Sequence, residues 1–322
     1  MGPRLRGGDE KLAATRIGSL MLPFARVTVI GMGLIGSSLT RAVRAHMPTV
    51  QLTVHDASPG VRARVRDLDL ADDVTDTPGA AVIDADLVIL AVPVLAMLKV
   101  AASIAADLPE GCVVSDTGSV KGSVLADLAE ALPEHVAIVP AHPVAGTEKS
   151  GPDAGFATLF EGRWCILTPP LAADALAVER VREFWTRLGA RVETMTPEHH
   201  DMVLAVTSHL PHLIAYSIVG TASDLESVTR SEVIKYSAGG FRDFTRIAAS
   251  DPVMWRDVFL SNKDAVLDVL QRFSEDLTAL QRAIRWGDGE ALEALFARTR
   301  AVRRGIVDEG QDTGDADFGR RR

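Results

Sequence analysis

Short apolar runs alternate with longer segments of helical spacing over residues 26–195. The runs have the length of buried strands, at residues 27–30, 51–55, 86–92, 112–115, 136–139, 164–168 and 191–194. The segments between the first strands, such as 34–45, 59–68 and 94–106, have helical character. Strands separated by crossover helices predict a parallel, doubly wound sheet, because parallel neighbours need a long right-handed return. We expect the later strands, from residue 136, to extend this sheet, some of them antiparallel.

The pattern changes after Met195, beyond which no strand-like alternation occurs. Apolar residues recur at helical spacing over 198–220, despite Pro211, and again over 262–286 and 290–302. These segments predict a second, all-helical domain. Its amphipathic faces are too many for one small core, so we expect it to join two chains in a homodimer, with helix 262–285 in the interface. The predicted parts are a flexible arm (1–24), an α/β domain (25–195), a helical domain (196–305) and a disordered tail (306–322).

Charge and composition narrow the classes of function. The 322 residues carry 34 Lys and Arg against 43 Asp and Glu, a formal net charge of −9, which argues against a general nucleic-acid binder. No apolar run approaches the ~18–20 residues that cross a bilayer, so we expect no membrane partner. Cys112 and Cys165 have neither disulfide nor metal spacing, which is typical of the reducing cytoplasm. A small-molecule substrate is the expected partner.

A glycine-rich turn, GMGLIGSSL, follows the first predicted strand. Gly31 allows the tight turn, Gly33 lets the backbone approach a pyrophosphate, and Gly36 allows a helix to pack closely on the strand. Backbone amides of the helix's first turn, including Leu34 and Ile35, would then hold the phosphates. The turn predicts a Rossmann-type dinucleotide-binding domain.

Asp56 ends the next predicted strand, 20 residues after Gly36. A carboxylate at this distance accepts hydrogen bonds from the ribose hydroxyls and repels a 2′-phosphate, which favours NAD over NADP. Asp56 could instead cap the following helix. Val92 and Pro93, at the end of the strand over 86–92, would lie along the cofactor.

Two further segments carry candidate chemistry where strands end. His142 follows a predicted strand and heads a glycine-rich loop, at the edge where ligands bind in open α/β sheets. Ser119, in SDTGSVKG, could orient an imidazole, bond a substrate hydroxyl or cap a helix. His209 and His212 share one helix face without an evident third ligand, so no metal is expected. The HHD cluster at 199–201 is interpreted as solvated residues at a helix start.

Several blocks resemble the prephenate dehydrogenase family, which includes arogenate and cyclohexadienyl dehydrogenases. Besides the glycine turn, they are DTGSVKG, HPVAGTEKSGPDAG, LFEGRWCILTP, HHDMVLAVTSHLPHLIAYSI and GGFRDFTRIAASDPVMWRDVFLSNK. They cover about residues 26–285, and the run that begins at HPVAGTEKSG is most similar to the bacterial cyclohexadienyl type. The resemblance implies NAD-dependent oxidative decarboxylation of prephenate and/or arogenate, on the route to tyrosine.

The resemblance also implies residue roles. His142 would take the proton of the ring hydroxyl, and Ser119 would orient that histidine and the hydroxyl. The implied substrate-binding residues are Arg246, His212, Thr147 and Glu148. Without the resemblance, Arg246 could equally be an ordinary surface arginine. A guanidinium suits a substrate carboxylate because it bonds both oxygens at once.

Two other classes of protein remain as alternatives. Another NAD-dependent hydroxyacid or hydroxyacyl dehydrogenase would share the two-domain build, but usually carries its catalytic Lys or His–Glu pair on different motifs. A non-catalytic NAD-binding sensor would keep the glycine turn and Asp56 without needing Ser119, His142 and Arg246 together. All three are present, which favours an enzyme.

Overall fold

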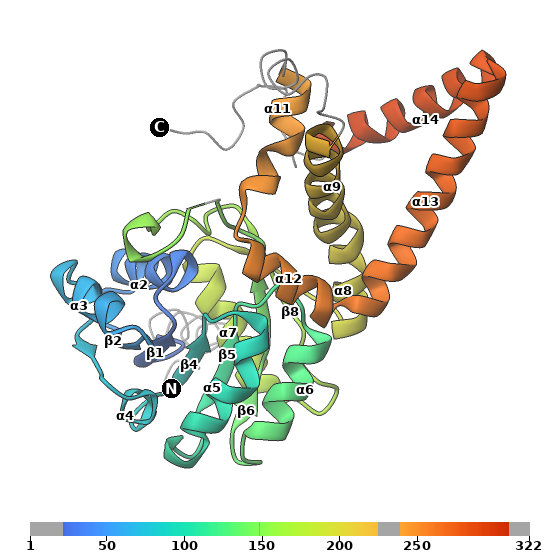
Figure 1. Cartoon of the computed structure of the whole chain (residues 1–322). Coiled ribbons are helices and arrows are strands. Elements are labelled where there is room, and N and C mark those ends of the chain that lie inside the picture. The colour runs from blue at the N-terminus through green and yellow to red at the C-terminus, as the bar shows by residue number, and fades with distance from the viewer. Residues whose placement is uncertain (1–21, 148, 225–238, 309–322) are drawn as a thin grey trace, which may run out of the picture. The chain divides into compact units, whose positions relative to one another are not determined.

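The computed structural model describes residues 22–147, 149–224 and 239–308 of the chain (Figure 1). Its larger sheet is parallel throughout, with the strand order β3-β2-β1-β4-β5-β6. These strands are β1 (Arg26–Ile30), β2 (Gln51–His55), β3 (Asp73–Val74), β4 (Leu87–Leu90), β5 (Val113–Asp116) and β6 (Ala137–Ile138). The strand order reverses between β1 and β4, which is where ligands bind in such sheets, and the predicted fold class is confirmed.

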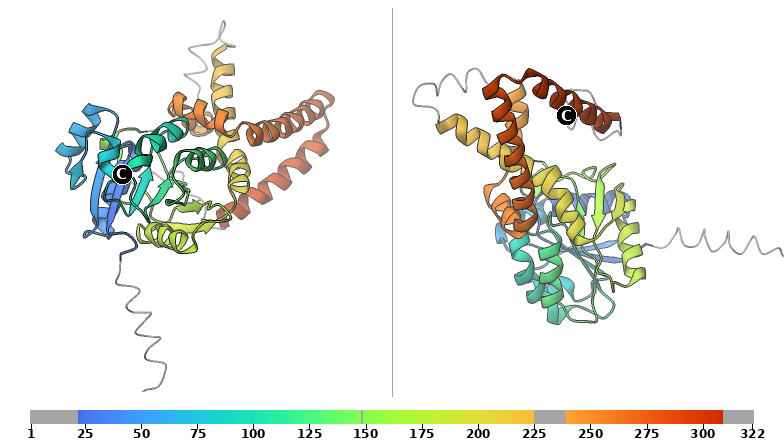
Figure 2. Two further views of the ribbon diagram at one scale, coloured as in Figure 1. Left: turned by 90° about the horizontal axis from the view of Figure 1, so that it is seen from below. Right: turned by 90° about the vertical axis from the view of Figure 1, so that its right-hand side faces the viewer.

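Helices cover both faces of this sheet (Figure 1, Figure 2). Because successive strand residues point to opposite faces, Val29 belongs to a core that also contains residues of α2, α3 and α7, whereas its neighbour Ile30 belongs to a core with α4, α5 and α6. The helices are α2 (Leu34–His46), α3 (Pro59–Asp67), α4 (Pro78–Val82), α5 (Met97–Ile104), α6 (Gly122–Ala131) and α7 (Ala175–Arg187). Burial on both faces explains why these strands are apolar throughout rather than alternating.

The predicted strand over 136–139 extends the parallel sheet as β6, but the strands that follow it do not, so the prediction was wrong for those. They form a separate sheet of β7 (Ala141–Pro143), β8 (Trp164–Leu167) and β9 (Arg191–Thr194), with β7 antiparallel and β9 parallel to β8. The break falls at Pro140, which has no N–H to donate to a strand ladder. The Ala141 amide instead donates to Oδ1 of Asp116 over 3.3 Å, so β7 begins beside the end of β5.

The region after β9 is helical, as predicted, but its first long helix is interrupted. It consists of α8 (Pro197–Leu204), a π-helical turn η4 (Ala205–His209) and α9 (Leu210–Asp224). Pro211 accounts for the interruption, because it lacks the N–H that would bond the carbonyl four residues earlier. The remaining elements are α11 (Gly239–Thr245), the 3₁₀ turn η6 (Arg246–Ala249), α12 (Pro252–Ser261), α13 (Lys263–Trp286) and α14 (Gly289–Asp308).

Contacts divide the chain into two compact units, with the break after Val266. The first unit contains both sheets and the helices through α12. The second contains most of α13, together with α14. The boundary drawn from the sequence, at residues 195 and 196, remains a prediction about domains.

The stretch Pro197–Asp224 corrects one sequence-based statement. By length and composition alone this 28-residue stretch, which contains an 18-residue window with a mean hydropathy of 1.5, could cross a membrane, whereas no segment was expected to reach that length. The stretch nevertheless carries His200, Asp201 and His209 buried in the protein. Its buried polar side chains belong to the site described next.

Candidate active site

The glycine-rich turn joins β1 to α2. Gly31 has a φ of +97°, and a Cβ there would lie 2.4 Å from the Ala91 carbonyl oxygen. A Cβ on Gly36 would lie 1.9 Å from the Gly31 carbonyl oxygen, so both positions require glycine. A Cβ on Gly33 would meet nothing within 4 Å, and α2 has neither a side-chain cap nor an acidic residue in its first turn. The turn therefore fits a pyrophosphate, because no side chain caps this helix start and the space beside Gly33 is open.

Asp56 lies at the end of β2, directly beside this turn. Its Oδ2 accepts a hydrogen bond from the Met32 amide over 2.8 Å, and its Oδ1 accepts one from the Ser58 amide over 2.9 Å. The cap of α3 is Ser58, so the alternative role of Asp56 as that cap is wrong. Arg62 donates to the Asp56 backbone carbonyl over 2.8 Å. The carboxylate is thus held against the turn that would bind the phosphates.

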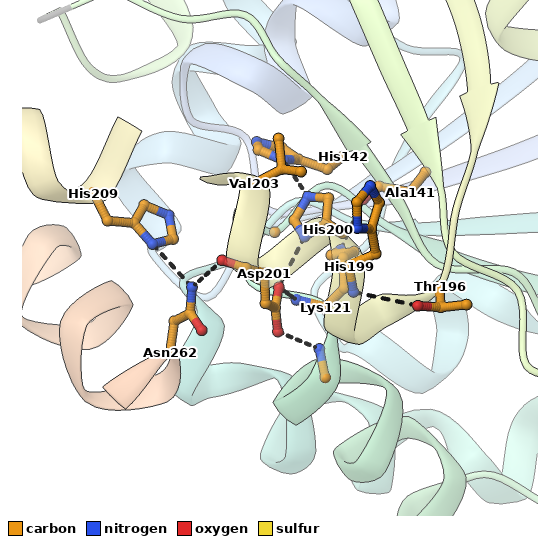
Figure 3. A network of polar contacts seen from close by, with 12 residues as sticks. Lys121, Ala141, His142, Thr196, His199, His200, Asp201, Val203, His209 and Asn262 are labelled. Atoms are coloured by element: carbon orange, nitrogen blue, oxygen red, sulfur yellow. Dashed lines mark hydrogen bonds and ion pairs between the residues drawn. The ribbon is translucent and has the colours of Figure 1, made fainter. Parts of the chain in front are cut away.

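His142 lies on β7 and is only 7% exposed. Its Nδ1 is 2.8 Å from Nε2 of His200, and Nδ1 of His200 is 2.8 Å from Oδ1 of Asp201 (Figure 3). The two oxygens of Asp201 also accept the backbone amides of Lys121 and Gly122, each over 2.8 Å. A chain of polar contacts therefore runs from the second sheet, through α8, to the start of α6.

A buried charge pair fixes the backbone beside His142. Lys121 and Asp116 are both fully buried and in contact, and Lys121 Nζ also donates to the Ala141 carbonyl over 2.8 Å. Burial lowers the pKa of Lys121, while the Asp116 carboxylate opposes that shift. Because breaking such a pair leaves a buried charge alone, it holds the end of β5 and the start of β7 in one arrangement.

Burial keeps His142 neutral. The pKa of His142 lies well below 6.5 because the ring is buried, and the neighbouring His200, Lys121 and His209 lower it further. The pKa of His200 is also lowered by burial, although Asp201 opposes this shift. A neutral imidazole at this edge of the fold can accept a proton near neutral pH.

His209 connects this cluster to the neighbouring helices. Nδ2 of Asn262 lies 3.1 Å from Nδ1 of His209 and donates to the Asp201 carbonyl over 2.8 Å. Burial lowers the pKa of His209 to about 4, although the backbone of Ser119 beside it opposes the shift. The backbone of Ser119 therefore lies against a ring in the same network. Since α6 begins at Gly122, with Lys121 as its cap residue, Ser119 is not the helix cap considered from the sequence.

The predicted substrate-binding residues His212 and Arg246 lie near each other. His212 is half-buried, donates from Nδ1 to the Ser208 carbonyl over 2.8 Å, and stacks on Trp255 with ring centroids 3.6 Å apart. Arg246 begins η6 and is exposed, and its charge helps to lower the pKa of His212, although burial is the main cause. Trp255 also lies against His209, with centroids 6.0 Å apart. These rings link the Arg246 region to the His142 cluster.

The loop that follows His142 returns to the nucleotide-binding helices. The Phe156 amide donates to Ser38 Oγ over 3.1 Å, and Arg41 donates to the Pro152 carbonyl over 3.0 Å. One loop therefore links β7 to α2. Thr147 is exposed on this loop, whereas Glu148 lies outside the described residues. No group of three or more His, Cys, Asp or Glu in the described ranges could hold a metal ion.

Two family models match the chain over almost all of its described length. "Prephenate dehydrogenase, nucleotide-binding domain" matches residues 39–194, and "Prephenate dehydrogenase, dimerization domain" matches residues 196–298. The chain belongs to the prephenate dehydrogenase family. The predicted family, and with it an NAD-dependent dehydrogenase, is thereby confirmed.

Individual members of the prephenate dehydrogenase family are similar over nearly the whole chain. A cyclohexadienyl dehydrogenase of Zymomonas mobilis is 48% identical over 88% of this chain and 96% of its own length. A prephenate dehydrogenase of Bacillus subtilis is 34% identical, over 87% of this chain and 76% of its own. The crystal structure of prephenate dehydrogenase from A. aeolicus, in complex with hydroxyphenyl propionate and NAD+, superposes with a TM-score of 0.80 at 35% identity, covering 89% and 98% of the two chains.

Sequence reasoning missed two residues of this site. The HHD cluster was expected to be solvated, which is wrong for His200, fully buried, and Asp201, 8% exposed, whereas His199 is exposed. The spacing held a signal, because His200 and the buried Leu204 are four residues apart on one face of α8. Because His200 and Asp201 are polar, the pattern did not indicate their burial. Buried polar groups need hydrogen-bond partners, and only the fold shows where these partners are.

Proposed function

We propose that this protein catalyses the NAD-dependent oxidative decarboxylation of prephenate and/or arogenate, to 4-hydroxyphenylpyruvate and/or tyrosine, most like a cyclohexadienyl dehydrogenase. The observation that carries the proposal is the state of His142. Its Nδ1 is engaged by His200, and burial keeps the ring neutral, so Nε2 remains as the basic nitrogen. A positioned base at the edge of a nucleotide-binding sheet is what removal of a hydroxyl proton requires.

The cofactor would lie across the carboxyl end of the parallel sheet. The first-turn amides at Leu34 and Ile35, with Gly33, would hold the pyrophosphate, and Asp56 would bind the ribose hydroxyls and disfavour NADP. Val92 packs beside Gly31, and Pro93 follows it at the strand edge. When bound, the nicotinamide ring supplies a hydride acceptor.

The protein's own groups would divide the remaining chemistry. His142 accepts the proton of the ring hydroxyl at Nε2 as hydride leaves the same carbon. The carbonyl formed there becomes the electron sink for loss of the ring carboxylate as CO2, and aromatisation of the ring drives the step. Ser119 bonds the hydroxyl rather than Nδ1 of His142, because His200 already occupies that nitrogen.

Substrate orientation falls to residues away from the base. Arg246 would bind a substrate carboxylate with its two parallel donors, and His212, stacked on Trp255, would face the side chain. Thr147, and Glu148 outside the described residues, would contact the substrate from the loop after β7. The side-chain end of the pocket would decide between the pyruvyl group of prephenate and the alanyl group of arogenate.

The first experiment is NADH formation with each substrate, in wild type and in His142→Asn. The wild type should turn over at least one of them. His142→Asn should lower kcat by roughly 10²–10⁴-fold, the usual contribution of a positioned general base. NAD binding, followed by quenching of tryptophan fluorescence, should be retained. Absence of turnover with both substrates, or near wild-type kcat in the variant, would refute the proposed reaction or the proposed base respectively.

We also propose that the enzyme is a cytoplasmic homodimer joined through the helical region. The matched model of residues 196–298 describes a dimerization domain. The large apolar side chains that α13 and α14 leave exposed supply a surface for a second chain: Leu267, Leu277, Ile284, Trp286, Phe296 and Val302.

A further inference from the structure

The contacts of Asp201 determine which nitrogen of each neighbouring histidine carries a hydrogen. Both carboxylate oxygens accept backbone amides, from Lys121 and Gly122, and Oδ1 also contacts Nδ1 of His200. A carboxylate only accepts hydrogen bonds, so Nδ1 of His200 must donate. In neutral His200 the other nitrogen, Nε2, is then a bare acceptor.

The same reasoning passes along the chain to His142. Because Nε2 of His200 is an acceptor, Nδ1 of His142 must be the donor across the 2.8 Å contact. Neutral His142 then carries its lone pair on Nε2. The opposite tautomer would place two lone pairs against each other and leave Nε2 unable to accept a proton.

We propose that His200 and Asp201 are positioning residues that hold His142 in the tautomer with a basic Nε2. This inference rests on the proposed function, in which His142 is the base. No proton needs to leave through the chain: Nε2 gains the substrate proton, while Nδ1–H stays bonded to His200. The imidazolium formed in this way keeps a hydrogen-bond acceptor that is itself oriented by a carboxylate.

The surroundings favour orientation over proton export. His200 is fully buried on α8, and the charged or titratable groups around the pair are Lys121 and Asp116 beside β5 and His209 on η4. Asp201 is fixed by the amides at the start of α6 rather than by solvent. Backbone amides therefore fix Asp201, and Asp201 in turn orients His200 and His142.

Two substitutions at His200 separate positioning from packing. In His200→Gln, the side-chain oxygen can accept from His142 and the side-chain N–H can donate to Asp201, so the donor and acceptor order is preserved. In His200→Leu, the cavity stays filled by an apolar group but the order is lost. We expect kcat within about 10-fold of wild type for Gln and about 10²-fold or more lower for Leu. The exposed neighbour supplies the control, because His199→Gln should leave kcat unchanged.

The tautomer can be measured without turnover. In ¹⁵N-histidine-labelled protein, the ring shifts of His142, assigned by comparison with His142→Asn, should show Nδ1–H in wild type and in His200→Gln. They should show a mixture, or Nε2–H, in His200→Leu. Thermal unfolding and NAD binding should establish that each variant is folded.

Different results would refute the positioning role and the proposed reaction. Equal kcat in the Gln and Leu variants, or Nε2–H on wild-type His142, would overturn the positioning role. If wild type turned over neither prephenate nor arogenate, the proposed reaction would be refuted. The tautomer measurement would still test whether His200 and Asp201 position His142.

Discussion

Three neutral histidines, His142, His200 and His209, are buried within one polar network. His200 and His209 must stay neutral to keep their contacts, because Nε2 of His200 accepts from His142 and Nδ1 of His209 accepts from Asn262, whereas His142 donates from Nδ1 and can take a proton at Nε2. The network therefore links protonation to the integrity of the fold. Burial is the main cause of the lowered pKa of all three rings, and it therefore favours the neutral form.

Stability should fall in acid partly through His209. Its pKa drops from 6.5 to about 4 on folding, so between these pH values the unfolded chain binds more protons than the folded one. The stability that depends on neutral His209 is complete above pH 6.5 and lost as pH falls toward 4, a difference of about 3 kcal/mol. Urea unfolding midpoints at fixed protein concentration should therefore depend less on pH in His209→Gln than in wild type. Parallel curves for the two proteins would contradict this assignment, and His199→Gln, at an exposed position, is the control.

The role of a residue could be predicted from the sequence where the backbone conformation requires one residue type. The roles of Gly31 and Gly36 could be assigned from the sequence because both follow from close approach of the backbone. In the structure, a Cβ on Gly31 or Gly36 would lie only 2.4 or 1.9 Å from a carbonyl oxygen. His142 was found because it follows a strand. His200 was missed because nothing local distinguishes a buried histidine from a solvated one at a helix start. Its partners are Asp201 on α8 itself and His142 on β7, and only the fold brings the latter to it.

At the scale of elements, most strands were predicted from their apolar runs, but β3 and β7 were not. The two-residue β3 and the three-residue β7 carry too few positions for a periodic signal. The separate second sheet follows from Pro140, whose effect depends on which ladder the next residue would have joined. Likewise, Pro211 signalled a disturbed helix, but its π-helical form at η4 depends on how α8 and α9 pack.

The β1–α2 turn offers a test at this scale. Gly36→Ala should destabilise the fold by about 1–3 kcal/mol, because the added methyl group would meet the Gly31 carbonyl oxygen. Gly33→Ala should leave the unfolding temperature nearly unchanged, since its Cβ would enter open space, yet should weaken NAD binding about 10-fold or more by occupying the side where the pyrophosphate approaches. Thermal unfolding and NAD titration measure the two effects.

A matched control for these variants is Gly60→Ala on α3, where a Cβ would meet only Ser58 Oγ, at 3.7 Å. It should alter neither property. If Gly33→Ala bound NAD as well as wild type, the turn would not be the pyrophosphate site.

At the scale of the whole molecule, the sequence showed that strands are followed by helices. It did not show the role of the last helices, α13 and α14. Among the described residues of α13, only Val266 is buried, although its apolar residues recur every three or four positions. A helix of this kind is stable when its apolar stripe is covered. What covers it cannot be derived from one chain's pattern, because a core and an interface use the same spacing.

The dimer prediction follows from that stripe. Leu277 and Ile284 are 48% and 67% exposed on α13, and their burial by a second chain would stabilise the assembly by about 1.5–3 kcal/mol for each side chain. Light scattering at micromolar concentration should give about twice the 34.4 kDa of one chain. Leu277→Glu with Ile284→Glu should shift the protein to monomer, whereas Ala279→Glu, on the other side of the helix, should not. A wild-type monomer, or a double variant that stays dimeric, would show that the apolar stripe of α13 serves another purpose. Because His142, His200 and Asp201 all lie in the first compact unit, a folded monomeric variant should keep the same His142 tautomer as wild type.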